Sequence, residues 1–213
     1  MRKITLIFFL LAWGDRPVAA EIIDRIAAVV GRQAIAQSEV DREARLERYF
    51  KKLPPARSSG WQSSDDTEIL ERLIQQRLIQ QEMEQTTFPP ASQAEVRKWL
   101  SEMQPDNPDP SSYGLSKDDL LEYAQRQVDI ERFIELRFRP GLQVTPEQIE
   151  TYYRKTLIPE LEHRGAADRP ALEKARGRIE QILVEEHATR LLEQWLSEAR
   201  ALAGVRIVEV ENP

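Results

Sequence analysis

The sequence predicts a mostly α-helical protein, a module of several long helices with a small antiparallel sheet that joins the two ends of the chain. Apolar residues recur at three- and four-residue spacing along most of the 213 residues, which is the period of an amphipathic helix. Ser, Thr and Pro stand where these periodic stretches begin, as helix caps do. Two short apolar stretches near the ends, 26–30 and 205–210, have the composition of strands instead.

The first twenty residues indicate export. Two basic residues precede an apolar run, Ile4–Trp13, and small residues occupy positions 18–20, which is the pattern of a cleavable signal peptide. The run is much shorter than the roughly 20 apolar residues of a membrane-spanning helix. We therefore expect cleavage after Ala20 and a protein without stable membrane insertion.

The composition argues against a nucleic-acid partner. The chain has 30 Lys and Arg against 36 Asp and Glu, for a formal net charge of -6, and it has no Cys. Binding to a phosphate backbone needs clustered basic residues, which an acidic chain of this kind lacks. An exported protein without Cys has no disulfides, so its stability has to come from buried apolar surface.

The first structural segment indicates a hairpin followed by a helix. Ile26–Val30 is continuously apolar, Gly31 begins a tight turn, and apolar residues resume at 34–35. Ser38 is the expected N-cap of a helix that runs to about Lys52. Further helices are expected at about 65–85, 92–103, 116–138, 145–157 and 170–203, with a polar connector at 160–169.

The last residues predict how the module closes. Gly204 ends the final helix, and Val205–Val210 alternates as a strand does. Because an isolated two-stranded hairpin is only marginally stable in water, a third strand is needed. We expect 205–210 to pair with 26–30 and to tie both ends of the mature chain together.

Residues typical of catalysis are scarce. The two histidines, His163 and His187, are isolated, and the sequence has no zinc-protease, nucleophile-elbow or phosphate-loop motif. We therefore predict no catalytic residue, no metal ligand and no cofactor, and we expect the protein not to be an enzyme.

Large apolar side chains in and beside the Pro-rich loops are the candidates for binding. Aromatic rings bring a large contact area, and Met adapts to varied shapes. They form the predicted peptide-binding set: Trp61, Met83, Phe88, Trp99, Met103 and Tyr113. The alternative is that these side chains fold back and fill the interfaces between helices.

Four segments, in this order, resemble the SurA family of periplasmic chaperones of outer-membrane proteins. They are IDRIAAVVGRQAIAQSEVD, ILERLIQQRLIQQEMEQ, TPEQIETYYRKTL and WLSEARALAGVRIVEV. The first is similar to the strand-turn-strand-helix entry of the family, and the last to its closing helix and strand. The resemblance covers about 22–210, is weak at 53–64 and 104–116, and implies a periplasmic location.

The chain departs from many members of this family at one place. They carry parvulin-type prolyl isomerase domains between the outgoing helix and the closing helix, whereas only residues 159–170 lie between them here, too few for a domain. After the signal peptide expected at 1–20, the resemblance implies an N-terminal helical chaperone module at 21–158, a short connector at 159–170, and a closing helix and strand at 171–213.

The expected function is that of an ATP-independent holdase. Such a protein binds extended apolar and aromatic segments of unfolded outer-membrane or envelope proteins, here in a shallow apolar cradle between the N-terminal helices and the final helix. Two alternatives stay open: a peptidyl-prolyl isomerase, and a non-catalytic envelope adaptor or dimerisation protein. A homodimer is an open possibility in either case.

Overall fold

The structure is a computed structural model that describes residues 24–55, 64–103, 108–165 and 169–208. Its larger part, the helical body, contains β1 (Ile26–Val30), β2 (Gln33–Ala36), α1 (Gln37–Phe50), α2 (Ser64–Gln85), α3 (Gln93–Met103), the 3₁₀ helix η1 (Pro110–Tyr113) and α4 (Lys117–Phe138). The rest contains α5 (Pro146–Tyr152), the π-helical turn η2 (Tyr153–Leu157), α6 (Ile158–His163), α7 (Leu172–Ala203) and β3 (Arg206–Ile207). The predicted fold class, mostly α with a small antiparallel sheet, is confirmed.

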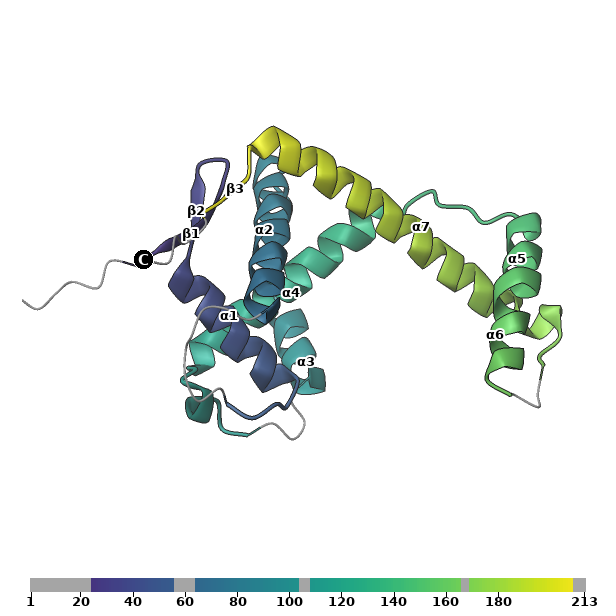
Figure 1. Ribbon diagram of the computed structural model, residues 1–213, viewed down its shortest axis with the longest axis horizontal. Helices are drawn as coiled ribbons and strands as arrows, with labels where there is room; N and C mark the ends of the chain where they lie inside the picture. The colour runs from purple at the N-terminus through teal and green to yellow at the C-terminus, as the bar shows by residue number, and fades with distance from the viewer. Residues whose placement is uncertain (1–23, 56–63, 104–107, 166–168, 209–213) are drawn as a thin grey trace, which may run out of the picture.

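Strands from both ends of the described chain form one sheet. Its order is β2-β1-β3, and both pairs are antiparallel, with Ala28 opposite Ile207 in the second pair. The predicted closure of the two ends is therefore present, and β3 lies beside β1 in Figure 1. The strand is shorter than expected, and residues 209–210 of the prediction lie outside the described residues.

The core of the body is built on α2. Five of its residues, Ile69, Leu70, Leu73, Ile74 and Leu78, are buried in one cluster with the inward side chains of the sheet. Side chains from the end of α7, among them Leu196 and Ala203, pack on the same cluster. The α2 side chains recur at the three- and four-residue spacing of a single helix face, and that face holds the first and the last segments of the described chain.

Helix α7 changes its buried face about halfway along its length. In its first half, Ala175 and Ile179 are buried against α5, η2 and the residues beside them. In its second half, Ala188 and Leu192 pack instead on α2 and α4. Residues spaced by three or four lie on the same face of a helix, as Ala175 and Ile179 do, and as Ala188 and Leu192 do. The step of nine residues from Ile179 to Ala188 makes about two and a half turns, so the second pair lies on the opposite face. Figure 1 accordingly shows α7 as a bridge from the helical body to a smaller unit around α5 and α6.

The predicted helix caps are present at three of the later helices. Ser92 with Glu95, Ser116 with Asp119, and Thr145 with Gln148 form reciprocal capping boxes at α3, α4 and α5. The hydroxyl and the N–H of Ser116 donate hydrogen bonds to the Asp119 carboxylate and lower its pKa. These bonds satisfy donors that a helix N-terminus otherwise leaves unpaired.

The cap predicted at Ser38 is not the one that the structure has. Helix α1 begins at Gln37, with the extended residue Ala36 as its N-cap and Glu39 at the third helical position. Ser38 lies inside the first turn, where its N–H and hydroxyl both donate to the carboxylate of Asp24. The capping carboxylate thus comes from just before β1, which a local sequence pattern cannot show.

The segment predicted as a polar connector is partly helical. The chain continues through the π-helical turn η2 into α6, which ends at His163. Pro159 stands in the first turn of α6, where a missing backbone N–H breaks no hydrogen bond of that helix. The wider π-helical turn just before Pro159 lets the chain remain helical on both sides of the proline.

The role of α2 predicts a large effect from one deletion in its core. Ile74 is fully buried, so Ile74→Ala is expected to lower the free energy of unfolding by about 2–5 kcal/mol. Leu202, which is 89% exposed, is the matched control, and Leu202→Ala should change the free energy of unfolding by less than about 0.5 kcal/mol. Urea unfolding followed by circular dichroism measures both. Equal effects of the two variants would contradict this placement of the core.

Candidate functional site

Aromatic side chains gather where α1 and α3 end. The ring of Phe50 stacks on Tyr123 of α4 with centroids 4.8 Å apart, and it meets Trp99 edge to face at 5.5 Å. Tyr49 continues the series to Tyr113, whose hydroxyl donates a 2.7 Å hydrogen bond to the carbonyl of Leu53. In Figure 1 the ends of α1 and α3 lie together at the lower end of the helical body.

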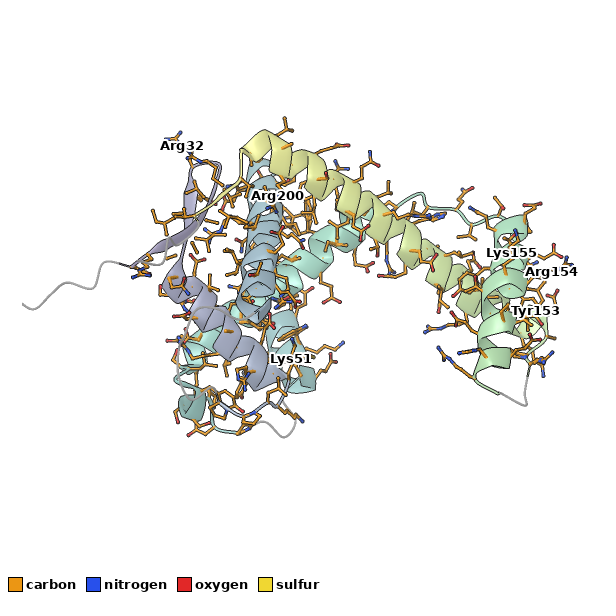
Figure 2. All side chains as sticks on the ribbon, in the orientation of Figure 1. Arg32, Lys51, Tyr153, Arg154, Lys155 and Arg200 are labelled. Carbon is orange, nitrogen blue, oxygen red and sulfur yellow. The ribbon has the colours of Figure 1, made fainter. Side chains whose placement is uncertain are left out.

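Exposed apolar side chains accompany this cluster. Met103 follows Trp99 by four residues and therefore shares its face of α3. Leu53 follows Phe50 just beyond the end of α1, and both Leu53 and Met103 are 44% exposed. We call Phe50, Leu53, Trp99, Leu100 and Met103 the aromatic end. Lys51, which Figure 2 labels, follows Phe50 at the end of α1.

The structure divides the predicted binding residues. Trp99, Met103 and Tyr113 belong to the region of the aromatic end, although Tyr113 is buried and only supports the chain beneath it. Met83 and Phe88 lie in a second cluster, where the ring of Phe88 meets Phe133 at 5.5 Å. The sixth residue, Trp61, lies outside the described residues.

The second cluster is structural rather than open. Phe133, Phe138 and Trp195 join α4 to α7 through ring contacts of 5.9 to 6.3 Å. Met83 and Phe88 pack against the edge of this cluster, and the guanidinium of Arg132 lies over the ring of Phe88. These aromatic side chains fill a helix interface, which was the alternative expected for loop aromatics.

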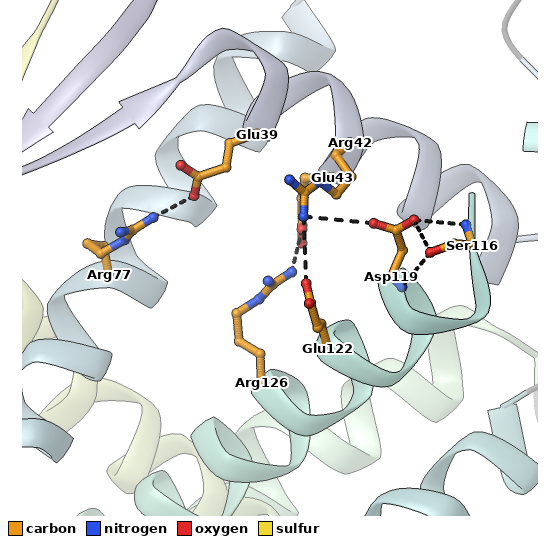
Figure 3. Close-up of polar contacts among 8 residues, drawn as sticks. All are labelled: Glu39, Arg42, Glu43, Arg77, Ser116, Asp119, Glu122 and Arg126. Atoms are coloured by element: carbon orange, nitrogen blue, oxygen red, sulfur yellow. Dashed lines mark hydrogen bonds and ion pairs between the residues drawn. The ribbon is translucent and has the colours of Figure 1, made fainter. Parts of the chain in front are cut away.

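A layer of ion pairs, which the sequence analysis did not identify, holds α1 against α2 and α4. Three glutamates spaced by four residues on α1 face arginines of the other two helices, and Figure 3 shows the first two pairs, those of Glu39 and Glu43. Glu39 pairs with Arg77 at 2.5 Å, and Glu43 pairs with Arg126 at 2.5 Å. The third, Glu47, pairs with Arg72. The i, i+4, i+8 spacing of these glutamates was the available signal.

A small cavity of about 360 Å³ opens beside this layer. Burial raises the pKa of Glu43, and Arg126 opposes that rise. Burial also raises the pKa of Tyr123 to about 12, with help from the charges of Glu43 and Glu47. Glu43 already accepts a hydrogen bond from Arg126, so its carboxylate is a structural partner and is poorly placed to transfer protons.

The groove beneath α7 differs from the apolar cradle that the sequence analysis expected. It is an open cavity of about 1100 Å³ between α7 and Arg139. Ile182 and Val184 are its large apolar residues, and the rest of its lining is mostly charged or polar, including Arg178 and Glu185. Arg139 forms an ion pair with Glu185. The aromatic end is therefore the better candidate surface for apolar segments.

The described residues were also compared with the requirements of a metal site and of a membrane-spanning helix. Within these residues, no three His, Cys, Asp or Glu side chains come together as a metal ion would require. No helix among them is both long enough and apolar enough to cross a membrane.

Comparison with models of known protein families and with curated proteins finds no match for this chain.

The buried Glu43 predicts a pH dependence of stability. Folding raises the pKa of this carboxyl above its value in the unfolded chain, near 4.5. The stability that the protonated carboxyl contributes is therefore fully present below pH 4.5 and is lost as the pH rises through the pKa of the folded state. Glu43→Gln removes this titration. The difference in unfolding free energy, wild type minus variant, should therefore shrink between pH 4 and pH 7 in urea titrations. A difference that grows with pH would mean that the Arg126 interaction outweighs burial.

Proposed function

We propose that this protein is an ATP-independent holdase of the periplasm, similar to the chaperone module of the SurA family. It would hold extended apolar and aromatic segments of unfolded outer-membrane or envelope proteins. The observation that carries the proposal is the aromatic end, where partly buried rings stand beside the exposed side chains of Leu53 and Met103. The order of the four sequence segments that resemble the family supports it.

The mechanism is reversible burial of apolar surface. Phe50 and Trp99 are fixed by their contacts with Tyr123, so they offer a rigid surface that loses little entropy on binding. Met103 and Leu53 add flexible side chains that adapt to different segments. Burial yields roughly 25 cal/mol per Å², and a surface of this size therefore binds weakly and without strong sequence preference.

The direct test is suppression of aggregation. An unfolded outer-membrane porin is diluted from urea in the presence of this protein, and light scattering is followed. Suppression at a stoichiometric ratio is expected without ATP. If several-fold excess of the protein leaves the scattering unchanged, the holdase proposal is overturned.

A pair of variants locates the binding surface. The double substitution Leu53→Ser with Met103→Ser removes exposed apolar area from the aromatic end, and we expect roughly tenfold weaker binding of an apolar client peptide by fluorescence anisotropy. Leu121→Ser with Leu136→Ser is the control, because these leucines are 44% and 62% exposed elsewhere on α4. Equal losses in the two variants would place binding elsewhere.

A refolding assay separates this proposal from isomerase activity. The protein at substoichiometric concentration should leave the rate of a proline-limited refolding reaction unchanged, because the segment between α5 and α7 is only long enough for η2, α6 and a short loop. Acceleration under these conditions would favour an enzyme.

A further inference from the structure

Within the part of the chain that the structure describes, the outer edge of β3 is unpaired. The sheet order is β2-β1-β3, so β3 pairs with β1 on one side, and no strand of the described residues pairs with its other side. Three of the large exposed apolar side chains lie at this corner of the sheet: Ile26 at 49%, Ile207 at 47% and Val208 at 44% exposure. Edge strands of stable proteins usually avoid a combination of free backbone and exposed apolar side chains.

The pairing with β1 determines which backbone groups of β3 are free. The N–H of Val208 donates a 2.9 Å hydrogen bond to the carbonyl of Ala27, and Ile207 stands opposite Ala28. In an antiparallel pair, successive residues direct their backbone groups alternately toward and away from the partner strand. The N–H and C=O of Ile207 therefore point away from β1, where an added strand would meet them.

Among the described residues, exposed arginines lie in and beside β1 and β3. The formal net charge is -6, but Arg25, which precedes β1, Arg32, which follows it, and Arg206 of β3 are all exposed, and none of the three forms an ion pair within the described residues. Arg206 belongs to β3 itself, and Arg32 is at the tip of the hairpin in Figure 2. The nearby carboxylate of Asp24 is occupied by Ser38. The complement of this surface is a partner with carboxylates.

We propose that the free edge of β3 binds an extended segment of a partner protein, in which apolar residues alternate with Asp or Glu, as a fourth antiparallel or parallel strand. Backbone hydrogen bonds to Ile207 would supply affinity, and Arg206 would select the acidic side chains. This surface lies in the sheet, away from the aromatic end, so the inference goes beyond the proposed function and holds whether or not the aromatic end binds clients.

The experiment uses the whole chain and a fluorescent ten-residue peptide of alternating Val and Glu. Anisotropy titration at low salt is expected to show saturable binding. Ile207→Pro removes the outward N–H together with the Ile side chain, at a position where an edge strand tolerates proline, and it should weaken binding about tenfold. Ile207→Ala is the matched control, because it keeps the N–H. Arg206→Glu should weaken binding of the Glu peptide and spare a Val-Lys peptide.

Modified peptides keep the test independent of how the variants fold. The Val-Glu peptide with every backbone nitrogen methylated loses the hydrogen-bond donors of both its edges, and it should not bind to the wild-type chain. Equal binding of the methylated and unmethylated peptides would overturn the proposal. So would a dimer of the wild-type chain that Ile207→Pro converts to a monomer in sedimentation velocity, because a second copy would then occupy the edge.

Discussion

The packing of one face of α2 is the constraint on which the rest of the structure depends. Leu70, Ile74 and Leu78 are buried there against the sheet, and the end of α7 packs on the same cluster. The contact is strengthened by polar bonds: the Gln81 amide donates to the carbonyl of Val30, and Arg200 of α7 pairs with Glu71. Without disulfides, this burial is what brings segments more than a hundred residues apart into one body. The short strand β3 adds little area of its own and depends on the helix before it.

The same arrangement determines where binding surfaces lie. Because the second half of α7 packs on α2 and α4, the aromatic rings of that region lie within the interface between these helices. The first half of α7 turns its apolar face toward α5, which leaves charged side chains facing the groove beside Arg139. Besides single exposed leucines such as Leu136 and Leu202, exposed apolar side chains thus lie at the aromatic end, where α1 and α3 terminate, and beside β3.

Most of the secondary structure could be predicted from local patterns, because apolar period and capping residues are local properties. The capping box at Ser116 and the stop at Gly204 are examples. Features that depend on partners distant in the sequence could not be predicted in this way. Asp24, not Ser38, supplies the capping carboxylate of α1. The sequence around Phe88 or Trp99 does not tell whether the ring fills an interface between helices or borders solvent. The ion pairs of Glu39, Glu43 and Glu47 had a visible spacing, but their arginines come from two other helices.

Native-state hydrogen exchange tests most directly whether α2 unites the two ends of the chain. Amides of β1, such as Ala28 and Val30, and amides of α7 between Leu196 and Ala203 should open in one cooperative unit. Both groups of amides are expected to show the same opening free energy and the same dependence on low concentrations of denaturant. If the α7 amides opened at distinctly lower free energy while β1 stayed protected, α7 would not be part of the core described here.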